Sequence, residues 1–255
     1  SSCPPVVCTL TALTDLRFER NELTVLTPLV GNLVEMRILD LSENKLTSLP
    51  RTIGNLSALV ELHCNDNDVN SLPPSMKDLY SLQRLTLAKN KLRVLPPDTA
   101  QLTALKRLTV SNNELTSLPP EMGSMSSLNE LLLDGNQLST LPLSIGRLTE
   151  LCVLNLDGNR LTMLPPEMAG MTALQELWIH DNQLAVIPEG IADLTNLCVL
   201  TLSNNQLTNL PSGMTRLVAL NELWIKDNLL RTHPFRQGLL PNLRVLLVDM
   251  GVQVV

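Results

Sequence analysis

Aromatic side chains are nearly absent from this sequence. Two Trp, one Tyr and two Phe make up 2% of its 255 residues, whereas hydrophobic residues in total reach 44%. A chain of this length can bury a substantial core, which must here be built from aliphatic side chains and from leucine above all. The positions of the two tryptophans are therefore informative.

Long apolar segments and an excess of basic residues are also missing. No apolar run approaches the roughly 20 residues that cross a bilayer, and no leader-like segment opens the chain, so we expect no membrane insertion. The formal net charge is -6, with 12 basic and 12 acidic residues in 1–115 and 7 and 13 in 116–255. Because binding to phosphates needs a basic surface, this balance argues against a nucleic-acid partner.

Common signatures of catalysis are absent too. The sequence contains no glycine-rich phosphate loop, no Cys-x-x-Cys pair and no nucleotide-binding motif. Its five cysteines are an odd number, which weakens any complete disulfide framework. Cys3 and Cys8 in "CPPVVC" can form a cap disulfide if the protein is extracellular, and two free thiols are the alternative.

A strict internal repeat dominates what is present. An 11-residue pattern, L-x-x-L-x-L-x-x-N-x-L, recurs with its asparagines 23 residues apart, as in "LQRLTLAKNKL" (82–92) and "LCVLNLDGNRL" (151–161). The asparagines are residues 21, 44, 67, 90, 113, 136, 159, 182, 205 and 228. An eleventh copy, "LRVLLVDMGVQ" (243–253), keeps the register but has Gly251 in place of asparagine.

This pattern resembles that of the leucine-rich repeat superfamily over residues 10–255. The other half of the repeat, as in "LPPEMGSMSSL" (118–128), resembles the 23-residue intracellular class of Ras-binding scaffold, Scribble–Erbin and plant Ras-group proteins. The resemblance implies an α/β solenoid, a right-handed horseshoe with a parallel concave sheet of about eleven strands and irregular or 3-10 convex segments. It also implies a cytoplasmic, non-enzymatic protein-interaction module without a cofactor.

The residues support this architecture independently. Apolar and polar side chains alternate in L-x-x-L-x-L, which indicates a strand with one buried face, and stacked strands lie about 4.8 Å apart. The following Leu-Pro step turns the chain into irregular or short helical structure on the opposite side. We expect residues 1–12 to form an N-terminal cap, 13–242 ten repeats, and 243–255 a partial eleventh repeat or a C-terminal cap.

Three residue types have clear structural interpretations. Each repeat asparagine lies where a strand ends, and its amide can satisfy backbone groups of its own turn and of a neighbouring turn. The leucines form the core. Cys64 occupies a place that other repeats fill with aliphatic residues, so we expect a small buried hydrophobic side chain.

Binding residues are expected at places three, five and seven of each repeat, counted from its first leucine, because these side chains point away from the core. Trp178 and Trp224 both occupy place five, in "LQELWIHDNQL" (174–184) and "LNELWIKDNLL" (220–230). Two strands separate them, so we expect a spacing of about 9.5 Å along the sheet, with Thr201 between them and neither ring buried by its own solenoid.

Large exposed aromatic residues beside charged ones commonly anchor protein interfaces. We therefore expect a protein or peptide to bind the concave face of repeats 6 to 11. Packing of the rings between repeats without a partner, and burial by an adjacent domain, are the alternatives. The candidate contact residues are Trp178, Trp224, Thr201, His180, Lys226, Leu132, Asn155, Leu247, Val153, Val199, Glu176 and Glu222.

Chemistry on this face is not expected. Asp157, His180 and Ser203 follow one another at place seven, but an open sheet supplies neither an oxyanion site nor a pocket that excludes water. Asp134 and Asp181 add to an acidic group that can be read as a metal site, although we interpret it as a solvated surface. We therefore expect no enzymatic activity and no bound metal ion.

Three functional settings fit these observations. The first is a signalling scaffold in the cytoplasm. The second is an extracellular or cell-surface recognition domain, for which Cys3 and Cys8 would be disulfide-bonded. The third is a regulatory array within a larger protein that carries a kinase or GTPase domain. We expect a monomer, with end-to-end dimers as an alternative through the bare last strand.

Overall fold

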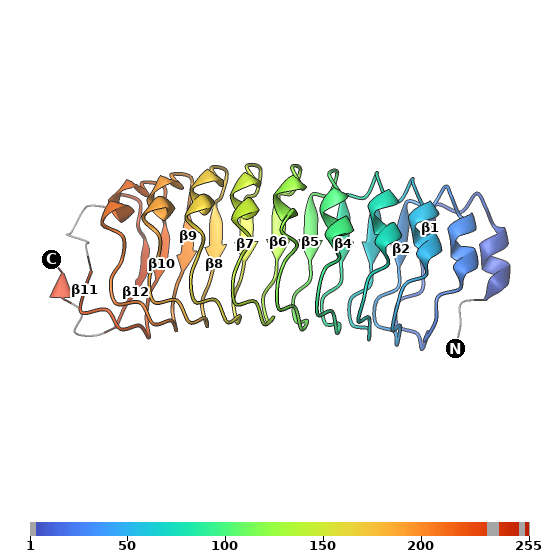
Figure 1. Cartoon of the computed structure of the whole chain (residues 1–255), viewed down its shortest axis with the longest axis horizontal. Helices are drawn as coiled ribbons and strands as arrows, with labels where there is room; N and C mark the ends of the chain where they lie inside the picture. Colours follow the sequence, from blue (N-terminus) through green and yellow to red (C-terminus); the bar gives the residue numbers. More distant parts are fainter. Residues whose placement is uncertain (1–3, 234–239, 250–252, 255) are drawn as a thin grey trace. The chain divides into compact units, whose positions relative to one another are not determined.

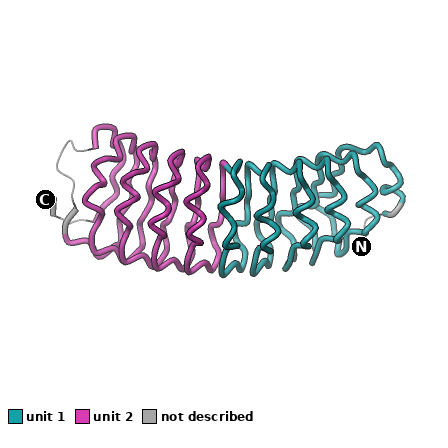
Figure 2. Tube along the Cα trace, turned by 45° about the horizontal axis from the view of Figure 1, so that its top comes forward, with its two compact units in different colours: residues 1–128 teal, residues 129–255 magenta. Residues whose placement is uncertain are grey.

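The chain forms two compact units of stacked repeats. The structure, a computed structural model, describes residues 4–233, 240–249 and 253–254. Unit 1 comprises residues 1–128 and unit 2 residues 129–255 (Figure 2). In each unit the strands form one layer and the 3-10 helices lie on the opposite side (Figure 1).

Every repeat contributes one strand of three residues, and strands that follow one another pair in parallel. In unit 1 the strands are β1 (Asp15–Arg17), β2 (Ile38–Asp40), β3 (Glu61–His63), β4 (Arg84–Thr86) and β5 (Arg107–Thr109). In unit 2 they are β6 (Glu130–Leu132), β7 (Val153–Asn155), β8 (Glu176–Trp178), β9 (Val199–Thr201), β10 (Glu222–Trp224) and β12 (Val245–Leu247). Paired residues are 23 apart, as the repeat predicts. The short strands β11 (Thr232–His233) and β13 (Gln253–Val254) pair separately.

The second half of the repeat forms 3-10 helices, because its prolines fix φ and cannot donate to a longer ladder. In unit 1 these are η1 (Pro5–Thr9), η2 (Pro28–Asn32), η3 (Arg51–Asn55), η4 (Pro74–Asp78), η5 (Pro97–Gln101) and η6 (Met122–Ser124). In unit 2 they are η7 (Leu143–Arg147), η8 (Pro166–Gly170), η9 (Glu189–Asp193) and η10 (Ser212–Arg216). Parallel strands on one side and 3-10 segments on the other confirm the predicted solenoid. Within the described residues no helix is long and apolar enough to span a membrane.

The core is aliphatic, as the composition predicts. The middle residue of each strand from β2 to β10 is buried, and the two residues beside it face the other way. Cys64 is fully buried, and this burial raises the pKa of its thiol far above the ordinary value. The expectation of a small buried hydrophobic residue at this place is therefore confirmed.

The asparagines bind the turns of consecutive repeats together, as predicted. The Asn113 amide donates to the carbonyl oxygens of Val110 (3.0 Å) and Ser111 (3.2 Å) in its own turn, and to that of Leu87 (2.9 Å) in the preceding repeat. Its carbonyl oxygen accepts the backbone N–H of Leu92 at 3.0 Å.

The same pattern recurs in unit 2, where Asn182 donates to Leu156, Ile179 and His180 and accepts from Leu161. Each interior asparagine thus satisfies buried backbone groups that the short strands leave unpaired.

Two positions on the helical side show how tightly the repeats pack. A Cβ added to Gly146 in η7 would overlap the carbonyl oxygen of Glu167 in η8, so only glycine fits there. In η5, Thr99 is fully buried at a place that holds Met76 in η4 and Met122 in η6. The Thr99 hydroxyl has no hydrogen-bond partner within the described part of the chain. Burial of this unpaired hydroxyl therefore lowers the stability of the folded chain.

The ends of the array differ from its interior. Thr27 stands where most repeats have proline, and its hydroxyl accepts the backbone N–H of Leu29 at the start of η2. In β12 all three side chains are exposed, including Leu246 at 41%. Cys8 is a buried free thiol, and Cys3, its partner in the alternative cap disulfide, lies outside the described residues.

Candidate binding face

The open face of unit 2 is the surface formed by places three, five and seven of β6 to β10 and β12. Trp178 in β8 and Trp224 in β10 both lie on it and are both half-buried. Their ring centroids are 6.5 Å apart with an interplanar angle of 71°, an edge-to-face contact. The rings thus lie closer together than the expected strand spacing of about 9.5 Å, because both side chains lean toward the strand between them.

Thr201 is on that strand, β9, and it is fully buried. Its hydroxyl accepts the backbone N–H of Ile179 at 3.2 Å. A side chain without exposed surface cannot contact a partner while the rings keep this arrangement. Two expectations about exposure are therefore wrong. Thr201 does not face solvent, because it is fully buried on the strand between the two tryptophans, and both rings are half-buried by the solenoid itself.

The two indole N–H groups have different environments. The Trp178 Nε1 donates to Glu176 Oε2 at 3.1 Å. Glu222 has the same spacing from Trp224, yet the Trp224 Nε1 is buried and has no hydrogen-bond partner among the described residues. The described part of the chain likewise offers no hydrogen bond or ion pair to the Glu222 carboxylate. The Glu222 carboxylate and the Trp224 indole N–H are thus both without a hydrogen-bond partner among the described residues.

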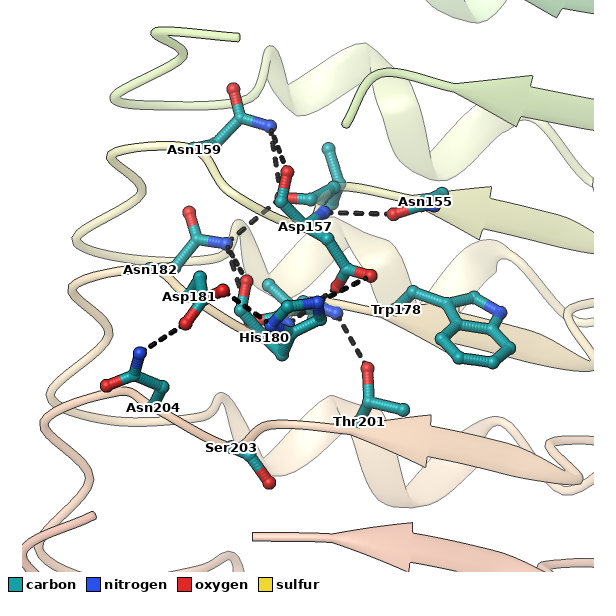
Figure 3. Close-up of polar contacts among 12 residues, drawn as sticks. Asn155, Asp157, Asn159, Trp178, His180, Asp181, Asn182, Thr201, Ser203 and Asn204 are labelled. Carbon is teal, nitrogen blue, oxygen red and sulfur yellow. Dashed lines mark hydrogen bonds and ion pairs between the residues drawn. The ribbon is translucent and has the colours of Figure 1, made fainter. Parts of the chain in front are cut away.

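A polar group at places seven and eight lies beside Trp178 (Figure 3). The His180 ring lies between two carboxylates, with Nε2 3.3 Å from Asp157 Oδ2 and Nδ1 2.9 Å from Asp181 Oδ2. The other oxygen of Asp157 accepts the backbone N–H of His180 at 2.7 Å. Asn204 donates to Asp181 and continues the network into the next repeat.

The Asp157 carboxyl is the most perturbed group on this face. Burial raises its pKa to about 6, with additional increases from the charges of Asp134 and Asp181. The charge of His180 and the hydrogen bond from the His180 backbone oppose this rise. Burial is thus the main reason why the ionised form of Asp157 is disfavoured.

The Asp157, His180 and Ser203 series does not form a catalytic triad. Both ring nitrogens of His180 face carboxylates, and Ser203 Oγ accepts the backbone N–H of Lys226 at 3.1 Å. A nucleophile needs its base within hydrogen-bond reach, and no such pairing is made here. No group of three or more His, Cys, Asp or Glu residues suited to a metal ion occurs in the described ranges.

The remaining predicted contact residues are spread along the same face. Lys226 and Leu247 are exposed, and the Lys226 ammonium lies 3.9 Å from Asp227. Asn155 uses its side-chain oxygen to accept the backbone N–H of Asp157. The half-buried ones are Leu132, Val153, Asn155, Glu176, Val199 and Glu222.

Sequence reasoning missed the local roles of Asp157 and Asp181, because it considered both only as candidate metal ligands and Asp157 also as a member of a catalytic series. One signal was available for Asp157, since short polar side chains fill most of place seven. Asn65 and Ser203 at this place also accept the backbone N–H of the next repeat's place seven.

Family comparisons agree with this architecture. The leucine rich repeat profiles match residues 80–138 and residues 35–56 and 196–217. No curated protein matches the sequence.

Solved structures give broader matches. A leucine-rich repeat protein of Leptospira interrogans is 30% identical with a TM-score of 0.77, and the match covers 100% of this chain and 75% of that one. An internalin from Listeria monocytogenes is 24% identical with a TM-score of 0.72, and the match covers 98% of this chain and 77% of that one.

A third match is a structure of the octameric complex of Latrophilin 3, Unc5D and the FLRT2 leucine-rich repeats. It is 25% identical with a TM-score of 0.70 and covers 86% of this chain and 76% of that one. With the repeat, the parallel strands and these matches together, the chain belongs to the leucine-rich repeat proteins.

Proposed function

We propose that this protein is a non-enzymatic interaction module that holds a protein or peptide on the open face of unit 2, the side predicted to be concave. The leucine-rich repeat fold supports protein–protein interaction in general. The tryptophan pair is the observation that carries the specific proposal. Both tryptophans of the chain lie on this one face, half-buried and in contact with each other.

The arrangement of the pair favours a partner. Two rings that pack edge to face form a rigid apolar platform whose ordering cost is already met in the free protein, and rigid aromatic platforms bind with little loss of side-chain entropy. Packing between repeats accounts for part of the ring surface, but both residues keep exposed surface. A partner that covers this surface would remove apolar area from water.

A role as a signalling scaffold in the cytoplasm is part of the proposal. Cys8, Cys64, Cys152 and Cys198 carry free thiols, which fits a reducing compartment. Mass spectrometry of the natural protein under non-reducing conditions tests this location. We expect five free thiols, and a mass lower by two hydrogen atoms in a cap peptide containing Cys3 and Cys8 would point to the extracellular alternative.

A peptide-display selection against the immobilised full chain tests the binding face. Ligands recovered on the parent protein should bind at least about tenfold more weakly to Trp178→Ala and to Trp224→Ala, because central aromatic residues dominate such interfaces. Tyr80→Ala is the matched control, since Tyr80 is the largest exposed aromatic side chain of unit 1. Circular dichroism confirms that each variant is folded. Ligands that bind both tryptophan variants as tightly as the parent would refute the proposal.

A further inference from the structure

The chemistry of the open face identifies the kind of partner. Resting on the proposed function, we infer that the ligand is an extended basic segment. Two cationic side chains about three residues apart would meet Glu176 and Glu222, and an apolar residue between them would cover the tryptophan pair.

The charge of the face is one-sided. Among places three, five and seven of β6 to β10 and β12, the basic residues are Lys226 and, when protonated, His180. The acidic residues at the same places are Glu130, Asp134, Asp157, Glu176, Glu222 and Asp249. A cationic partner would therefore be steered toward this face and favoured over an acidic one.

Unit 1 provides the internal contrast. Its corresponding places combine carboxylates with Arg17, Arg84 and Arg107, and the Arg84 guanidinium contacts Glu61 at 3.1 Å. At place eight of the same unit, Lys89 lies 3.7 Å from Asp66. Opposite charges pair there within the chain, whereas carboxylates outnumber basic side chains at the corresponding places of unit 2.

Two of these carboxylates frame the aromatic pair. Strand pairing places Glu176, Val199 and Glu222 in one row, parallel to the row of Trp178, Thr201 and Trp224. The two glutamates are thus two strand spacings apart, about 9.5 Å. In a β strand side chains i and i+3 point to opposite sides, whereas an extended segment in the polyproline II conformation rises about 9.3 Å over three residues and returns side chains i and i+3 to the same side, which matches this separation.

Both glutamates can accept further hydrogen bonds. Glu176 uses one oxygen for the Trp178 indole, and a carboxylate has two oxygens with about four acceptor sites. Glu222 makes no hydrogen bond or ion pair with its carboxylate in the described part of the chain. A guanidinium can bind a carboxylate through two parallel hydrogen bonds and stack on an indole face at the same time.

Asp157, at place seven on the other side of the tryptophan row, also favours a cationic partner. Its partly buried carboxylate lies 3.3 Å from the His180 ring on this face, and burial, together with the charges of Asp134 and Asp181, disfavours its ionised form. A cation near Trp178 would lower the free energy of the ionised form. The segment that covers the tryptophans would thus gain from a positive charge on its Asp157 side as well.

A defined peptide tests the inference. The probe is a dodecapeptide with Arg-Leu-Val-Arg at its centre, flanked by Gly and Ser, and the readout is the emission of the protein's only two tryptophans. We expect saturable binding that weakens at least about tenfold when citrulline, a neutral arginine analogue, replaces both arginines. The Glu176→Gln/Glu222→Gln double variant should lose the preference for arginine over citrulline. Glu114→Gln in unit 1, whose carboxylate pairs with Arg93, should keep it.

Each outcome decides one of the two ideas. No binding of the arginine peptide up to millimolar concentration, equal binding of the citrulline peptide, or an unchanged preference in the double variant would overturn the basic-segment inference. Display-selected ligands that lack basic residues but need Trp178 and Trp224 would overturn this inference alone and leave the proposed function standing. Ligands indifferent to both tryptophans would overturn the proposed function itself.

Discussion

Replacing one interior asparagine should destabilise the array far more than replacing the first one. Asn113 makes four hydrogen bonds to backbone groups, two of them in the preceding repeat. Asn21 has the same place in the first repeat and donates only to Phe18 (3.1 Å) and Glu19 (3.0 Å) of its own turn. The two positions therefore compare the same residue with and without its bonds between repeats.

The expected magnitude follows from the groups left behind. Asn113→Ala leaves the buried N–H of Leu92 without an acceptor, which costs about 1 to 3 kcal/mol. Three carbonyl oxygens each lose one donor, worth about 0.5 to 1 kcal/mol apiece. We expect a total loss of about 3 to 5 kcal/mol for Asn113→Ala and about 1 kcal/mol for Asn21→Ala, whose partners are exposed.

Urea unfolding followed by far-ultraviolet circular dichroism measures both free energies, and amide hydrogen exchange measures the local effect. The Leu92 amide should lose protection in Asn113→Ala beyond that of amides two repeats away. Equal losses of stability in the two variants, or an unchanged Leu92 amide, would refute the idea that asparagine couples neighbouring repeats.

Three further substitutions test other parts of the structure. The Asp157 carboxyl has its pKa raised to about 6, so its contribution to stability is lost as pH rises from about 4 to 6. Asp157→Asn, which keeps the acceptor for the His180 N–H, should therefore stabilise the protein by about 1 to 2 kcal/mol at pH 7 after allowance for solvent screening, and by little at pH 4. Thr99→Val should raise stability by about 1 kcal/mol in thermal unfolding, because it removes a buried hydroxyl without a partner. Gly146→Ala should cost about 1 to 3 kcal/mol in urea, because the new methyl group would press on Glu167.

Each of these has a clear contrary result. A gain from Asp157→Asn that is equal at pH 4 and pH 7 would show that charge burial is not its source. A Thr99→Val variant that unfolds at a lower temperature than the parent protein would show that the Thr99 hydroxyl has a hydrogen-bond partner. Gly158→Ala is the control for Gly146→Ala, because nothing at Gly158 comes closer to an added Cβ than 3.6 Å and only its positive φ opposes the change. A Gly146→Ala variant as stable as the parent would show that the repeats can yield at Glu167.

The sequence predicted the fold well because one period determines it. The leucines within each repeat determine which face of the strand is buried, and the asparagine marks the turn at the end of the strand. Because the repeat length is 23 residues throughout, the register between neighbouring repeats follows as well. The asparagine contacts followed from the chemistry of a single amide at a strand end, and the structure confirms them at Asn113 and Asn182.

Side-chain directions on the open face were less predictable. Strand spacing gives the separation of backbones, but the rotamers of Trp178 and Trp224 bring their rings to 6.5 Å. Thr201 is buried because a small side chain between two large ones leaves room for both rings. The raised pKa of Asp157 depends on burial and on charges from other repeats, which a linear pattern does not show.

The unbroken 23-residue register also affects how such a surface can change during evolution. Each repeat contacts the next through the same pairs of positions, so an in-frame gain or loss of one repeat leaves all remaining neighbours matched. The strings "LQELWI" and "LNELWI" are 46 residues apart, the length of two repeats, which is what copying of a two-repeat segment produces. One more copy would add a third indole and a third glutamate to the same two rows. Recombination could thus lengthen the recognition surface without redesign of the core.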